Sequence, residues 1–225
     1  MESRLVLACE MMEHEIRAAM GRADLSCPVV WLERELHNDP KRLREALQEQ
    51  IDQAQAEDVL LAFAQCGNAA VGLKAGRCRL VLPRFADCIH LLRSRTSGDP
   101  GEVDIRTLYL SPGFLEGRCG LFRDYDRCCA RYGAKKARQI CRMMVQHYRA
   151  VSMMDTGAVD AAEYAPRAQE LSELLGLQYE TCSGTFRVLT KLFSGEWDDE
   201  FVVIPPGGQV KGEAFWQTAP SAWLT

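Results

Sequence analysis

Short apolar runs alternate with segments of helical periodicity along most of the chain. Short runs rich in Val, Leu and Ile are typical of strands, and apolar residues three or four positions apart are typical of helices. Because the two patterns alternate, we expect an α/β fold with a mostly parallel sheet and helices on both faces, a Rossmann-like arrangement. The pattern predicts about eight strands, at Leu5–Ala8, Pro28–Leu32, Val59–Ala64, Arg79–Leu82, Ile105–Leu110, Val151–Met154, Gln178–Cys182 and Phe201–Ile204.

The predicted helices have recognisable ends. Asp39 can cap the first turn of a long helix, and Pro40 suits its first position. Later in the chain, Gly133 separates two helices, and Gly176 ends another. Further helices follow the first strand, the fourth strand and Ser183-Gly184.

The polar segment Ser94–Glu102 interrupts the alternation with glycine, proline and charge. We therefore expect two α/β halves, residues 1–98 and residues 99–225, with a single continuous domain as the alternative. The chain after Pro205 has an irregular pattern, and it could serve as a partner-binding arm or as a packed tail.

Composition is that of a globular protein, with 225 residues, 47% of them hydrophobic and 26% charged. A net charge of −4 gives no general attraction to nucleic acid or to an anionic membrane. Solvated helix faces explain the basic clusters at 41–44 and 135–138. No apolar run reaches the roughly 20 residues of a membrane helix, and the N-terminus does not resemble a secretion signal, so we expect a cytoplasmic protein. The oligomeric state is left open.

The ten cysteines are the unusual feature of the composition. In reducing cytosol they are expected to be free, buried or metal-bound rather than paired in disulfides. Six lie at strand starts or within helical patterns and read as small buried apolar residues: Cys27, Cys78, Cys119, Cys128, Cys129 and Cys141. Four others lie at or beside turns: Cys9, Cys66, Cys88 and Cys182.

The segment Ala62–Arg84 is the centre of the functional prediction. It reads as a strand, a glycine turn carrying Cys66, a short helix and a second strand, with Cys88 just beyond. Cys9 ends the first predicted strand, and the carboxyl ends of parallel strands share one edge of a sheet. Three thiolates at that edge could hold zinc, another soft metal or an iron–sulfur cluster. A single reactive thiol and buried cysteines without chemistry are the alternatives, because the spacing matches no local metal motif.

Other residues near these turns are candidates for the same site. Helix N-termini beside Cys88 and Cys9 are expected to lower thiol pKa values. Asp87 could cap a helix or ligate a metal, and His37 flanks a helix start. Gly67 would let the backbone approach a ligand or turn tightly after Cys66, and the adjoining Asn68 is a candidate cofactor-binding residue. The other three histidines, His14, His90 and His147, read as surface or packed residues.

The stretch from Gly67 to Lys74 partly matches a phosphate-binding loop. Its glycines have the right interval, but Leu73 stands where that motif needs lysine. A nucleoside triphosphate site is therefore disfavoured.

Several segments resemble the domain-of-unknown-function family DUF1638: ACE (8–10), LHNDPKRLREAL (36–47), CGNAAVGLKAG (66–76), LVLPRFADCI (80–89), YLSPGF (109–114), DTG (155–157) and VVIPPG (202–207). Members of that family are common in anaerobic bacteria and archaea, often beside corrinoid-dependent methyl-transfer systems. The resemblance implies that Cys9, Cys66 and Cys88 are functional, and that a corrinoid protein or a methyltransferase is a partner. The corrinoid-binding pattern Asp-x-His-x-x-Gly is absent, so a corrinoid would not be held in the usual manner.

Three functions are compatible with these observations. The first is a metal- or metallocofactor-binding protein in one-carbon or corrinoid-dependent methyl transfer, either as an enzyme or as a methyltransferase component. The second is a non-catalytic protein that delivers or assembles a metal, an iron–sulfur cluster or a corrinoid. The third is an α/β module that binds a small anion and has inert cysteines.

Overall fold

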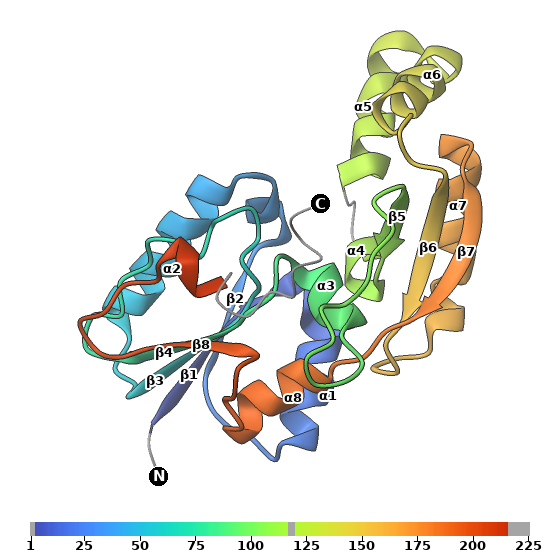
Figure 1. Ribbon diagram of the computed structural model, residues 1–225. Coiled ribbons are helices and arrows are strands. Elements are labelled where there is room, and N and C mark those ends of the chain that lie inside the picture. Colours follow the sequence, from blue (N-terminus) through green and yellow to red (C-terminus); the bar gives the residue numbers. More distant parts are fainter. Residues whose placement is uncertain (1–2, 117–119, 216–225) are drawn as a thin grey trace. The chain divides into compact units, whose positions relative to one another are not determined.

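The computed structural model describes residues 3–116 and 120–215, which form eight strands in two sheets (Figure 1). All eight predicted strands are confirmed, with small shifts of their ends. They are β1 (Arg4–Cys9), β2 (Val29–Leu32), β3 (Asp58–Ala62), β4 (Arg79–Pro83), β5 (Thr107–Leu110), β6 (Ala150–Asp155), β7 (Gln178–Ser183) and β8 (Phe201–Ile204).

The first sheet has the strand order β2-β1-β3-β4-β8. The first four strands are parallel, and β8 joins the edge antiparallel to β4, with Leu80 opposite Ile204. Every residue of β3 is buried, as expected for a central strand that is covered on both faces. Helices α1 (Glu13–Arg22) and α8 (Arg187–Ser194) lie on one face, and α2 (Pro40–Gln53) lies on the other (Figure 1).

Helix α2 begins where the sequence predicts. The Asp39 side chain accepts hydrogen bonds from the backbone N–H groups of Lys41 and Arg42, at 3.1 and 3.2 Å. Pro40 occupies the first turn, where its missing N–H is not needed. The buried side chains Leu43, Leu47 and Ile51 recur every four residues and turn one face of the helix towards the core.

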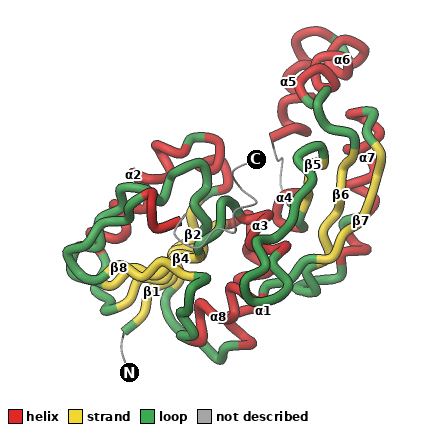
Figure 2. Tube along the Cα trace, viewed as in Figure 1, coloured by secondary structure: helices red, strands yellow, loops and turns green. Residues whose placement is uncertain are grey.

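The short helix predicted between β3 and β4 is wrong. Residues 63–78 instead form a series of turns, coloured as loop in Figure 2. Gly67, Gly72 and Gly76 all have positive φ, which a right-handed helix cannot contain. The backbone also bonds to the C-terminal segment, for example from Gly72 N to Val210 O at 2.8 Å.

The second sheet has the order β5-β6-β7 and is parallel throughout (Figure 2). Its core contains Val151 and Met153 of β6 together with Leu171 of α7 (Ala165–Leu175). The predicted break at Gly133 is confirmed: it separates α5 (Gly120–Tyr132) from α6 (Ala134–Met144) with a φ of 78°. Gly176 ends α7 in the left-handed conformation, also as predicted.

The chain divides into two compact units, and the first is discontinuous. It comprises the chain up to Glu102 together with the chain from Thr185 onward, and the second unit is Val103–Gly184. The expected halves, 1–98 and 99–225, divide the chain near the same polar segment but assign the C-terminal segment differently. In the first unit, β8 pairs with β4, which brings Phe201–Ile204 back to the first sheet.

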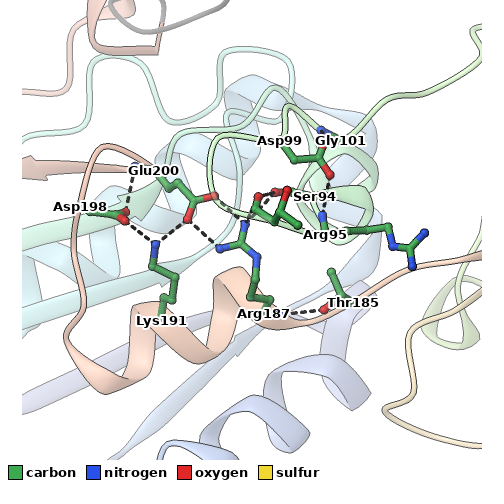
Figure 3. Close-up of polar contacts among 10 residues, drawn as sticks. Ser94, Arg95, Asp99, Gly101, Thr185, Arg187, Lys191, Asp198 and Glu200 are labelled. Atoms are coloured by element: carbon green, nitrogen blue, oxygen red, sulfur yellow. Dashed lines mark hydrogen bonds and ion pairs between the residues drawn. The ribbon is translucent and has the colours of Figure 1, made fainter.

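Within the first unit, a charge cluster around the buried Glu200 connects the chain after Thr185 to the Ser94–Glu102 segment (Figure 3). Arg187 donates to both carboxylate oxygens of Glu200, at 2.6 and 2.8 Å, and to Ser94 Oγ at 2.8 Å. Lys191 donates to Glu200 at 2.6 Å. The polar segment that sequence analysis marks as a boundary is thus held against α8.

Two short helices complete the described chain, α3 (Cys88–Arg93) and α4 (Pro112–Leu115). Over the residues described, none of the helices is both long and apolar enough to cross a membrane.

Candidate functional site

Three cysteines follow three neighbouring parallel strands of the first sheet. Cys9 is the last residue of β1, Cys66 follows β3, and Cys88 is the first residue of α3, just after β4. Because β1, β3 and β4 are adjacent and parallel, their carboxyl ends meet at one edge of the sheet.

The three thiols are close enough to influence one another's charge. Cys9 raises the pKa of Cys66, and both Cys66 and Cys9 raise the pKa of Cys88. Asp87 adds its negative charge to the surroundings of Cys66 and Cys88. The sequence prediction that these turns lie together is therefore supported by the electrostatic interactions among them.

Burial dominates the acidity of these thiols. Enclosure of the sulfur atoms raises the pKa of Cys9 to about 11 and that of Cys66 to about 12, and it raises the pKa of Cys88 well above its usual value. Backbone N–H groups of Met11 and Met12 lower the pKa of Cys9, but less than burial raises it. The expectation that helix N-termini make these cysteines acidic is wrong, because desolvation outweighs the helix. At neutral pH the three groups are thiols.

Cys66 lies in an unusual backbone conformation. Cys66, Gly67 and Asn68 have φ values of 46°, 63° and 70°, all in the left-handed region. Glycine adopts this region freely and asparagine tolerates it, but a residue such as cysteine is destabilised there by about 1–2 kcal/mol. Such strain persists where the surrounding structure holds it, often at functional sites.

The neighbouring chain fixes the position of Cys66. Its backbone N–H donates to Ala86 O at 3.0 Å, and the N–H of Gln65 donates to Phe85 O at 2.9 Å. These bonds join the turn after β3 to the turn after β4. They bring the residue before Asp87-Cys88 beside the turn that carries Cys66.

Asp87 caps helix α3, which confirms the first of the two roles predicted for it, capping a helix or ligating a metal. Its Oδ1 accepts from the backbone N–H of His90 at 3.0 Å and lies 2.8 Å from His90 Nδ1. Burial raises the pKa of Asp87, but the hydrogen bonds from His90 lower it by more than burial raises it. The pKa of Asp87 is therefore below its usual value, and the carboxylate stays ionised. Sequence analysis predicts that His90 is a surface or packed residue, and its pairing with Asp87 is an additional finding. The signal was its position, three residues after Asp87 on the same helix.

The remaining predicted site residues lie in two turns. His37 is exposed in the 3₁₀ turn Arg34–Asn38. Another residue of that turn, Arg34, lowers the pKa of Cys9 through its positive charge. The sequence does not indicate this role. Gly67 and Asn68 are both exposed. A Cβ atom at Gly67 would lie 3.1 Å from Pro40 Cγ, so the turn runs close to the start of α2.

Of the cysteines predicted to be small buried residues, Cys78 and Cys141 are buried, whereas Cys27, Cys128 and Cys129 are only partly buried. Cys78 is buried and bonds to Ala75 O at 2.9 Å. Cys141 lies in the core of the second unit, where burial and then the nearby Cys128 raise its pKa. Cys182 belongs to β7 in the same unit, and Cys119 lies outside the described residues.

A family model described as "Protein of unknown function (DUF1638)" matches residues 31–193. This span covers most of the chain. The chain belongs to that family. The match includes Cys66 and Cys88, whereas Cys9 precedes it. Neither a curated protein nor a solved structure matches the chain.

The donor set of this DUF1638 chain suits a soft metal. Three sulfur atoms from adjacent strand ends resemble the ligands of zinc and of iron–sulfur clusters, and a cation would offset the cost of ionising buried thiols. Across 3–116 and 120–215, however, no group of three or more His, Cys, Asp or Glu side chains is arranged to hold a metal ion.

Proposed function

We propose that this protein binds a metal ion or metallocofactor through the thiolates of Cys9, Cys66 and Cys88. The observation that carries the proposal is the placement of three thiols, Cys9 buried and Cys66 and Cys88 half-buried, at the ends of adjacent parallel strands. Zinc and an iron–sulfur cluster are the groups that suit three sulfur donors.

The finer proposal is a role in one-carbon or corrinoid-dependent methyl transfer. It rests on the resemblance of the cysteine turns to a family found beside such systems. When bound, zinc would supply a positive charge that makes a substrate thiol ionise at neutral pH. The chain's own thiolates would hold that charge, and Arg34 and Asp87 would adjust the field around it.

A turnover assay tests the enzymatic version. A methylated corrinoid serves as donor and a small thiol as acceptor, and formation of the thioether is measured. We expect turnover by the native protein and its loss both on chelation and in Cys66→Ser. Cys78→Ser is the matched control, because Cys78 is buried but lies outside the cluster. Turnover that survives both chelation and Cys66→Ser would contradict this proposal.

A delivery protein is the second candidate, because Cys66 is only half-buried and the adjoining Gly67 and Asn68 are exposed. An acceptor protein could therefore reach a cargo held at this turn. This version predicts stoichiometric transfer of metal, cluster or corrinoid to an acceptor protein and no turnover by the chain alone. Multiple turnovers in the purified protein would exclude it.

A further inference from the structure

The strained turn at Cys66 is held from the side by helix α2. Arg44, on α2, donates from one terminal guanidinium nitrogen to Asn68 O at 2.7 Å and from Nε to Ala69 O at 3.3 Å. A planar guanidinium that donates to two successive carbonyl groups fixes their direction better than a single donor could. The carbonyls belong to Asn68, the last residue of the left-handed run, and to Ala69, which follows it.

Backbone hydrogen bonds join those residues to Cys66 and join Cys66 to the neighbouring turn. Ala69 N donates to Cys66 O at 3.2 Å, which closes the turn on itself. The N–H of Cys66 is held by Ala86 O on the opposite side. Releasing the carbonyls of Asn68 and Ala69 would let the turn relax towards ordinary φ values, and this relaxation would rotate the Cβ of Cys66.

We propose that Arg44 is a positioning residue that keeps the thiol of Cys66 directed towards Cys9 and Cys88. This inference rests on the proposed function, because it assigns Arg44 to the same three-thiol site. Arg44 bonds to the loop backbone, so it acts through the turn after β3 rather than by contacting a bound group.

The structure supplies a matched control on the same helix. Gln48, one turn after Arg44, donates to Lys74 O at 3.1 Å and accepts from Lys74 N at 2.9 Å. It therefore makes two hydrogen bonds to the same loop, but well beyond the left-handed run. Gln48→Ala and Arg44→Met each remove two loop contacts, and only the second releases the turn that carries Cys66.

The first experiment is an oxygen-free titration with Co²⁺, with native protein, Arg44→Met and Gln48→Ala compared. Sulfur-to-cobalt absorption reports thiolate ligation, and competition with Zn²⁺ gives the affinities. We expect Arg44→Met to bind about tenfold or more weakly, as with other residues that orient metal ligands, and Gln48→Ala to stay close to the native protein. Equal affinities for Arg44→Met and Gln48→Ala would overturn the inference.

A second measurement tests the inference without any metal. The alkylation rate of Cys66 in the metal-free proteins is followed by peptide mass spectrometry. We expect faster alkylation of Cys66 in Arg44→Met than in native protein or Gln48→Ala, because its thiol turns out of the enclosed cluster. An unchanged rate in Arg44→Met would overturn the inference. Failure of the native protein to show sulfur-to-cobalt absorption would instead contradict the proposed function.

Discussion

At the scale of single residues, desolvation raises the pKa of each of the three thiols, Cys9, Cys66 and Cys88. The apolar runs mark where the strands end, so Cys9, Cys66 and Cys88 could be assigned to one edge of the sheet. Their raised pKa values depend on how deeply folding encloses each sulfur, which no local pattern records. The same limit applies to Arg44 and Arg34, whose contacts join distant parts of the chain.

Asp87 gives a prediction at this scale. Asp87→Ala removes the cap of α3 and should lower the free energy of unfolding by about 1 kcal/mol. Asp87→Asn keeps a side-chain oxygen that can accept from His90 N, so it should stay within a few tenths of a kcal/mol of the native protein. Urea denaturation at pH 7 measures both. An equal loss in the two variants would show that the charge of Asp87, rather than its capping bond, stabilises the helix.

At the scale of elements, the sequence predicts where the strands lie but not which strands pair with one another. Strand β8 was identified from Phe201–Ile204, but its antiparallel pairing with β4 could not be inferred from its composition. The helix expected after Cys66 is replaced by turns, because the backbone groups there bond to the returning segment near Val210. The chain just before β8 is held to α8, because Arg187 and Lys191 of α8 both donate to Glu200 (Figure 3).

The carboxylate of Glu200 should make stability depend on pH. Burial tends to raise its pKa, but the hydrogen bonds from Arg187 and Lys191 lower it below the ordinary value of 4.5. Its stabilising contribution is therefore complete above about pH 4.5 and is lost as the pH falls through the lower pKa of the folded state. Glu200→Gln should lower the free energy of unfolding by about 2 kcal/mol at pH 7 and by less at pH 3.

Urea titrations at the two pH values measure this difference. Asp198→Asn is the control, because Asp198 pairs with the same lysine but its side chain is 49% exposed. It should cost at most about 1 kcal/mol. A loss of stability in Glu200→Gln that is the same at pH 3 and pH 7 would contradict the assignment.

At the scale of the whole molecule, the polar segment Ser94–Glu102 lies where the first unit gives way to the second. Its sequence does not indicate that the chain rejoins the first unit at Thr185. The pattern of apolar residues indicates whether the faces of a strand are buried, but it does not indicate which sheet the strand joins. The first unit therefore contains α8 and β8 from beyond Thr185, with Leu189, Leu192 and Phe193 buried.

This organisation predicts that residues 1–102 do not fold alone. The fragment lacks β8 and the apolar face of α8, so it should show no cooperative transition in urea followed by circular dichroism. Thr185 N bonds to Leu92 O at 2.7 Å, so a short Gly-Ser linker could join residues 1–102 to 185–225. That joined chain should unfold cooperatively. Cooperative unfolding of residues 1–102 alone would contradict the division.

The most direct test of the three-thiol site is metal and sulfide analysis of protein purified without oxygen. Native protein is compared with Cys9→Ala, Cys66→Ala and Cys88→Ala, and with Cys78→Ala as the control. We predict bound zinc, or iron with sulfide, in native protein and in Cys78→Ala, and its loss in each of the other three variants. Native protein without metal, or metal retained in all three variants, would contradict the site and leave the cysteines as buried apolar residues.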